Sequence, residues 1–76
     1  MSAKEMFEEL GYKLDINNEK ELLYCKSCYG SIGEFYFRVW FYKDYKTFEI
    51  SKRSPEIDIP LLRAINKQVE ELQWNK

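Results

Sequence analysis

Two cysteines three positions apart, Cys25 and Cys28, are the residues of this chain whose type and spacing could support chemistry. Two thiolates at this spacing can bind one metal ion from one side, and a structural zinc site takes four ligands, usually cysteine or histidine. The chain has no histidine and only these two cysteines. The pair therefore indicates either half of a zinc site, which carboxylates or a second copy of the chain would complete, or two ordinary thiols.

The backbone around the cysteines decides between these alternatives. In a flat strand, side chains alternate between two faces, so Cys25 and Cys28 would point in opposite directions. They converge only if the strand ends at Cys25 and the chain curls toward Gly30. In that arrangement, the carboxylates expected nearby belong to Glu34, Glu56 and Asp58. A thioredoxin-type redox role is not expected, because the pair does not open a helix.

Length and composition describe a small, aromatic-rich protein. Its 76 residues include six tyrosines, five phenylalanines and two tryptophans, and we predict one domain that spans residues 1–76. Buried aromatic rings can supply a compact core in so short a chain without disulfides. The formal net charge is −1, which argues against a general nucleic-acid binder.

The sequence also predicts where the protein resides. The N-terminus has no apolar stretch of the kind found in signal peptides, and no segment approaches the about 20 apolar residues of a transmembrane helix. We therefore predict a cytoplasmic protein with no membrane partner. Cysteines in that compartment stay reduced, so a disulfide between Cys25 and Cys28 is not the expected state.

Hydrophobic periodicity predicts a helix at each end of the chain. At residues 2–10, Ser2 and Glu5 form a capping box, and Gly11 provides the left-handed conformation that ends a helix. Near the C-terminus, Asp58 is a good N-cap for a helix that ends near Trp74. The apolar stripe predicted for this second helix consists of Leu62, Ile65, Val69 and Leu72.

Four strands are predicted between the helices, at residues 12–16, 21–28, 34–42 and 47–52. Turn-forming residues separate them, so neighbouring strands are expected to pair antiparallel. The predicted fold class is therefore α+β: a two-layer sandwich in the order helix, four-stranded antiparallel meander, helix. Both helices are expected to cover the face that carries Phe37 and Phe41.

The register of the last hairpin follows from its apolar residues. Three cross-strand pairs define it: Tyr42 with Thr47, Phe41 with Phe48, and Val39 with Ile50. The Phe41–Phe48 and Val39–Ile50 pairs lie on one face of the sheet. The other face then carries four side chains of the strand at residues 34–42: Tyr36, Arg38, Trp40 and Tyr42. We predict that these four residues form a partner-binding surface.

Three interpretations of this surface remain open. Tyrosine, tryptophan and arginine dominate the hot spots of protein interfaces. Aromatic side chains on a sheet also stack on the bases of single-stranded nucleic acids. The same residues could simply cover a half-exposed sheet. An enzyme is not expected, because the chain has neither a histidine for acid–base chemistry nor a phosphate-binding loop.

Two segments resemble the termini of short proteins encoded by phages and prophages of Gram-positive bacteria: residues 4–12 (KEMFEELGY) and 64–72 (AINKQVEEL). The return strand that begins at residues 46–48 fits the same pattern. Most proteins of this kind have no assigned function, and some are anti-CRISPR inhibitors that bind an RNA-guided nuclease. We therefore predict a phage-encoded protein, monomeric or dimeric, that sterically inhibits a host protein, with a CRISPR nuclease as the first candidate. The Cys25 and Cys28 pair departs from the pattern, so a metal role for these residues cannot be carried over from the resemblance.

Overall fold

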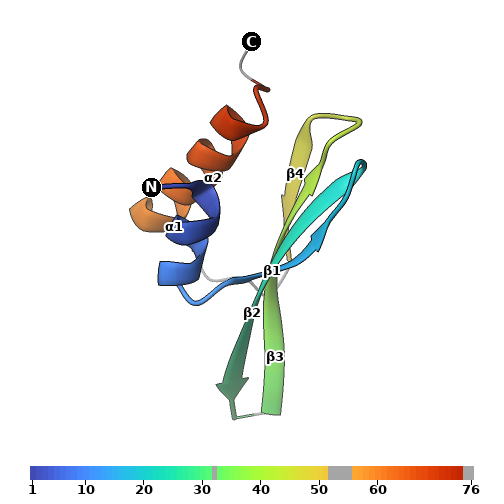
Figure 1. Cartoon of the computed structure of the whole chain (residues 1–76). Coiled ribbons are helices and arrows are strands. Elements are labelled where there is room, and N and C mark those ends of the chain that lie inside the picture. Colours follow the sequence, from blue (N-terminus) through green and yellow to red (C-terminus); the bar gives the residue numbers. More distant parts are fainter. Residues whose placement is uncertain (32, 52–55, 75–76) are drawn as a thin grey trace.

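The computed structural model describes residues 1–31, 33–51 and 56–74. Its elements are α1 (Ala3–Glu9), β1 (Lys13–Asn17), β2 (Glu21–Gly30), β3 (Gly33–Tyr42), β4 (Thr47–Ile50) and α2 (Ile59–Glu71). The strands form one antiparallel sheet in the order β1-β2-β3-β4, and both helices lie on the same side of it (Figure 1). The α+β fold is the one predicted. Neither described helix has the length and apolar character needed to cross a membrane.

Both helices begin at polar N-caps, as predicted. The Ser2 side chain accepts a hydrogen bond from the Glu5 N–H, and the Glu5 carboxylate accepts one from the Ser2 N–H, which forms the capping box. At α2, Asp58 accepts a hydrogen bond from the Leu61 N–H at 2.9 Å. Gly11 follows α1 with a φ of +92°, a conformation that a Cβ disfavours, and turns the chain into β1.

The register of the β3–β4 hairpin is confirmed. Phe41 lies opposite Phe48, and Val39 lies opposite Ile50. Because side chains alternate along a strand, this register sends Val39 and Phe41 toward the helices and Trp40 to the other side of the sheet.

Strand β1 differs from the prediction because it contains a β-bulge. Leu14 lies opposite Tyr24, but after a register shift Ile16 lies opposite Leu23. A bulge inserts one extra residue and so reverses the alternation of side chains beyond it. Leu14 consequently joins the helix-facing side, and Ile16 joins the opposite side, although their spacing in the sequence suggests a single face.

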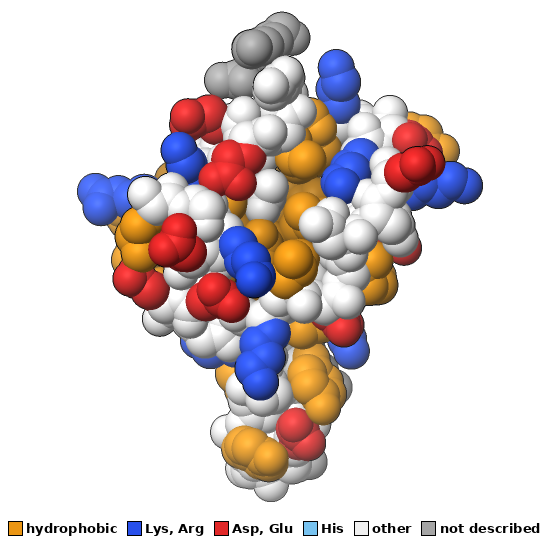
Figure 2. Space-filling model, viewed as in Figure 1, with side chains coloured by type: hydrophobic (Ala, Val, Ile, Leu, Met, Phe, Trp, Pro, Cys, Tyr) orange, Lys and Arg blue, Asp and Glu red, His pale blue; other side chains and the backbone are white. Residues whose placement is uncertain are grey.

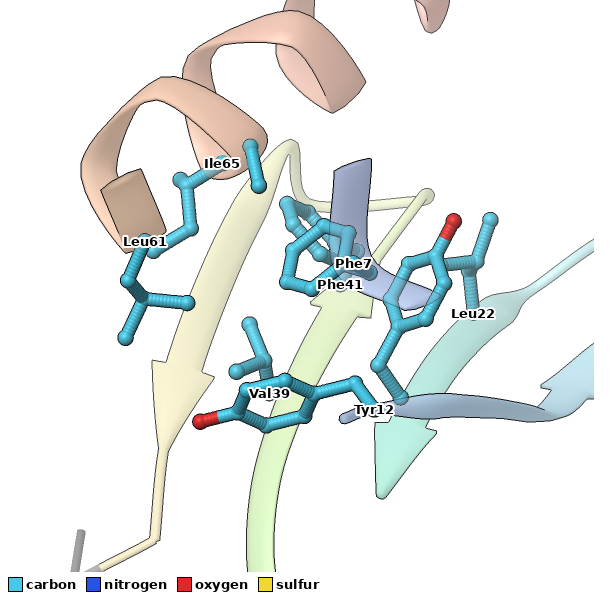
Figure 3. Packing of buried hydrophobic residues seen from close by; sticks show 9 residues of the cluster. Phe7, Tyr12, Leu22, Val39, Phe41, Leu61 and Ile65 are labelled. Atoms are coloured by element: carbon cyan, nitrogen blue, oxygen red, sulfur yellow. The ribbon is translucent and has the colours of Figure 1, made fainter. Parts of the chain in front are cut away.

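The core lies between the helices and one face of the sheet (Figure 3). Its buried members include Phe7, Leu22, Tyr24, Val39, Phe41, Leu61, Ala64 and Ile65. The Phe7 ring stacks on the Tyr24 ring with 3.9 Å between centroids. The Tyr24 hydroxyl donates a hydrogen bond to Gln68 Oε1 at 2.6 Å, which satisfies a polar side chain that is only 5% exposed.

Helix α2 buries a stripe that matches the predicted one in part: Ile65 is buried, and Val69 and Leu72 are partly buried against the core. Its buried residues are Leu61, Ala64, Ile65 and Gln68, whereas Leu62 is 42% exposed. Helix α1 packs on the side of α2 that carries Glu71, whose carboxylate accepts a hydrogen bond from the Ala3 N–H at 2.7 Å. Nine residues at about 100° each separate Leu62 from Glu71, so Leu62 points to the opposite side of the helix. The prediction was wrong for Leu62, because the sequence pattern of α2 does not indicate on which side of it α1 packs.

Strands β2 and β3 extend beyond the helices as a two-stranded arm (Figure 1). Within the described residues, β1 pairs with β2 as far as Cys25, and β4 pairs with β3 as far as Val39, with one further hydrogen bond from the Ser51 N–H to the Arg38 carbonyl. The described chain is accordingly elongated, at 43 × 23 × 18 Å. The helices bury Phe41 completely, but Phe37, nearer the arm, is only half-buried.

Candidate functional site

The four residues predicted to bind a partner lie together on the side of the sheet away from the helices. We call this surface the open face and define it by Tyr36, Arg38, Trp40 and Tyr42 of β3 with Leu23, Cys25 and Ser27 of β2. Val39 and Phe41, which alternate with the β3 members, are completely buried under the helices. The burial of those two residues fixes the direction in which the open face points.

The β3 side chains of the open face are held in two pairs. The Arg38 guanidinium carbon lies 5.3 Å from the centroid of the Tyr36 ring, a cation–π contact of a type that contributes about 0.5–1 kcal/mol at exposed sites. The Trp40 and Tyr42 rings are stacked, with 6.3 Å between centroids and an interplanar angle of 13°. These contacts restrict the side chains before any partner arrives.

Hydrogen bonds to carboxylates restrict the two tyrosines further. The Tyr36 hydroxyl donates to Glu34 at 3.1 Å, and this bond raises the pKa of Tyr36. The Tyr42 hydroxyl donates to Glu49 at 3.0 Å, and burial together with this bond raises the pKa of Tyr42. Both phenols are therefore neutral at physiological pH, and both present a fixed polar tip on an aromatic body.

Part of the open face is sealed by its own side chains. Leu23 is only 3% exposed although both described helices lie on the other side of the sheet (Figure 1). Its neighbours across the strands are Trp40 on one side and Ile16 on the other, and directly opposite residues lie within about 5 Å of each other at Cβ. The Trp40 indole N–H is buried, with no acceptor in the described part of the chain. Sequence reasoning missed this small cluster, because only the bulge in β1 brings Ile16 to this face.

The arm end of the open face contains a shallow hollow of about 660 Å³. Its lining includes two cations, Lys13 and Arg38, and two carboxylates, Asp15 and Glu34. Gly11 forms part of the wall. The charges balance, so the hollow suits a ligand surface with both donors and acceptors rather than a polyanion. No local sequence signal indicates Lys13 or Asp15 as site residues.

The two cysteines do not converge. Strand β2 continues through both of them to Gly30, so the condition for a shared metal site is not met. Cys25 lies opposite Arg38 on the open face, and Cys28 lies opposite Phe35 on the other side. The Cys25 thiol is 3.8 Å from an Asp15 carboxylate oxygen, and burial together with that charge raises the pKa of Cys25. A raised pKa disfavours the thiolate that binds metal.

The carboxylates expected to complete a zinc site are divided between the two faces. Glu34 lines the hollow together with Cys25. Glu56 and Asp58 instead line a small cavity with Tyr12 and Leu61, two residues of the core on the helix side. Among residues 1–31, 33–51 and 56–74, no group of three or more Cys, Asp or Glu side chains is placed to hold a metal ion. Coordination by both thiols of one chain would require β2 to bend.

Comparisons of the chain with models of protein families, with curated proteins and with solved structures give no match. The inference of function therefore starts from the geometry of the open face.

Proposed function

We propose that this protein binds another protein through the open face and acts by occupying a surface that its partner needs. The observation that carries the proposal is that Tyr36, Arg38, Trp40 and Tyr42 lie on the face of the sheet away from both described helices and are held in two pairs. These are the residue types that contribute most to interface hot spots. Because their positions are already restricted, little side-chain entropy is lost on docking.

We further propose that the partner is a host protein and that the protein is a phage-encoded inhibitor, with an RNA-guided CRISPR nuclease as the first candidate. The resemblance of residues 4–12 and 64–72 to small phage proteins supports this step. The mechanism is steric and assigns no catalytic residue to the chain. The net charge of −1 and the balanced charges of the hollow suit a protein surface better than a phosphate backbone.

A plasmid-interference assay tests the target. Cells that carry a CRISPR nuclease and a matching plasmid are transformed with and without this gene, and plasmid survival is counted. In parallel, calorimetry measures the affinity of the purified protein for the nuclease complex. We expect Arg38→Ala and Trp40→Ala each to weaken binding about 30-fold, because truncation of a hot-spot residue costs about 2 kcal/mol or more. Lys67→Ala, on α2, is the matched control and is expected to bind like the wild type.

The outcomes separate the parts of the proposal. If the nuclease remains active and unbound, the target is wrong, and the same variants are then tested on partners captured from host lysate. If Arg38→Ala and Trp40→Ala leave every captured interaction intact, the open face is not the binding surface. A filter-binding assay with single-stranded DNA over a salt series addresses the alternative function. Affinity that falls with salt and is lost in Trp40→Ala would favour a nucleic-acid binder.

A further inference from the structure

We propose that the open face binds an arginine side chain of its partner against the stacked rings of Trp40 and Tyr42, between two carboxylates. The carboxylates belong to Glu21 of β2 and Glu49 of β4. The inference rests on the proposed function, because it names the chemistry of the surface that the open face would meet. It concerns the end of the open face away from the arm, and none of these four residues lines the hollow.

The arm end of the open face shows the complete arrangement of a ring, a carboxylate and a cation. The Tyr36 hydroxyl donates to Glu34 at 3.1 Å, and the Arg38 guanidinium carbon lies 5.3 Å from the centroid of the Tyr36 ring. The hydrogen bond to Glu34 raises the pKa of Tyr36, and the positive charge of Arg38 acts in the opposite direction. At this end, the chain itself provides the cation that an aromatic ring and a carboxylate attract.

The other end of the open face repeats the ring and the carboxylate. The Tyr42 hydroxyl donates to Glu49 at 3.0 Å, and Glu49 lies directly opposite Trp40. Glu21 lies directly opposite Tyr42 on β2, so its side chain is on the same face of the sheet. The stacked rings are therefore bordered by one carboxylate on each neighbouring strand.

The described chain provides no cation at this end. Among residues 1–31, 33–51 and 56–74, no lysine or arginine forms an ion pair with either carboxylate or lies over either ring. Lys43 follows Tyr42 in the sequence, but its ammonium donates to Asn17 and Asn18 at the β1–β2 turn. Burial raises the pKa of Tyr42, and the two carboxylates raise it further. Within the described chain, two negative charges thus border the rings without a positive one.

Arginine fits this arrangement better than other ligands that a partner could offer. Its guanidinium is planar, so it can stack on an aromatic ring while its N–H groups donate to carboxylates. The ammonium of lysine is a compact and strongly hydrated point charge, which gains less from a ring. A phosphate would be repelled by both carboxylates. The same charges therefore disfavour a nucleic-acid backbone at this end of the open face.

The helix layer on the other side of the sheet has a different distribution of charge. Figure 2 shows acidic and basic side chains interspersed over the helices. On α2, for example, Lys67 and Glu70 form an ion pair at 3.6 Å. Because carboxylates in this layer have basic neighbours, an added cation should gain less from them.

The probe for this site is Nα-acetyl-arginine amide, titrated into the isotope-labelled intact protein and followed by NMR. We expect a saturable shift of the Trp40 indole N–H signal. The Trp74 indole packs near Phe41 on the helix side of the sheet and should not respond. Nα-acetyl-citrulline amide has the same shape without the charge and should produce no saturable shift.

Substitution of the two carboxylates tests the role of their charge. The double variant Glu21→Gln with Glu49→Gln removes both charges but keeps an acceptor for the Tyr42 hydroxyl. We expect it to raise the dissociation constant of the arginine compound roughly tenfold. Glu9→Gln, at an exposed position of α1, is the matched control and should bind like the wild type. The inference is overturned if the citrulline compound binds as well as the arginine compound, or if the double variant keeps the affinity of the wild type.

The same double variant separates this inference from the proposed function. Both are supported if a partner captured from host lysate binds weakly to Trp40→Ala and also to the double variant. Weak binding to Trp40→Ala with wild-type binding to the double variant would overturn the arginine site and leave the open face as the binding surface. Wild-type binding of the partner to Trp40→Ala would overturn the proposed function and, with it, the arginine site as a contact to the partner.

Discussion

The hydrogen bond between Tyr24 and Gln68 offers the sharpest test of the core. We expect Tyr24→Phe to destabilise the protein although it keeps the ring that stacks on Phe7. The substitution removes the hydroxyl that donates to Gln68 Oε1 at 2.6 Å. Gln68 is 5% exposed and Tyr24 is 1% exposed, so water cannot replace the lost donor without a local opening of the core.

The expected loss in the free energy of unfolding follows from Gln68 Oε1, which is left without a hydrogen-bond donor. An unsatisfied buried polar group costs about 1–3 kcal/mol. At roughly 0.05–0.15 kcal/mol per residue, the free energy of unfolding of a chain this short is about 4–11 kcal/mol. One kcal/mol shifts the Tm of a domain of this size by roughly 4–8 °C, so the loss should be visible in any thermal scan.

Urea unfolding followed by tryptophan fluorescence provides the assay. Tyr36→Phe is the matched control, because it removes the same hydroxyl at a 44% exposed position, where changes are usually within about 0.5 kcal/mol. The double variant Tyr24→Phe with Gln68→Leu removes both polar groups and should be more stable than Tyr24→Phe alone. If Tyr24→Phe unfolds at the same urea concentration as Tyr36→Phe, the hydrogen bond contributes nothing and the reasoning is refuted.

Three further predictions concern pH, backbone strain and metal. Burial raises the pKa of Tyr24 from 10.0 to about 12. Between pH 10 and pH 12, Tyr24 has lost its hydroxyl proton in the unfolded chain but keeps it in the folded chain. The contribution of the Tyr24 hydroxyl to stability is therefore complete below pH 10 and is lost as the pH rises toward 12. The urea midpoints at pH 9 and pH 11 should accordingly differ less in Tyr24→Phe than in the wild type. Gly11→Ala should cost about 1–3 kcal/mol, measured by urea unfolding, because Gly11 has a φ of +92° and an added Cβ would lie 3.2 Å from the Lys26 side chain. A zinc site at Cys25 and Cys28 would give equimolar zinc in elemental analysis and a lower Tm in the presence of a chelator. Because the two thiols lie on opposite faces of the sheet, we expect neither result. Equimolar zinc that is lost in Cys28→Ser would contradict this geometry.

Much of the fold is predictable because short-range rules govern it. The caps at Ser2 and Asp58 depend on one side chain each, and both helices begin there. The β3–β4 register is fixed by the need to place Phe41 and Phe48 on the same face. The open face follows from simple alternation along β3 once that register is known.

The features that escaped prediction depend on tertiary packing. Leu61 and Leu62 are adjacent, and either fits a helical stripe, so only the position of α1 decides that Leu62 is exposed. The bulge between Leu14 and Ile16 contains no glycine or other local signal. The burial of Leu23 depends in turn on the bulge, which places Ile16 beside it. The composition of the hollow was missed for the same reason, because it draws on β1, β2 and β3 together.

Site-specific photo-crosslinking in host cells tests the binding role of the open face most directly. A photoreactive phenylalanine analogue replaces Tyr36 in one version of the protein and Lys67, on α2, in another. We predict that irradiation gives a discrete covalent adduct with one host protein from position 36 and none from position 67. Adducts from position 67 alone, or equal adducts from both positions, would contradict the assignment of the open face as the binding surface.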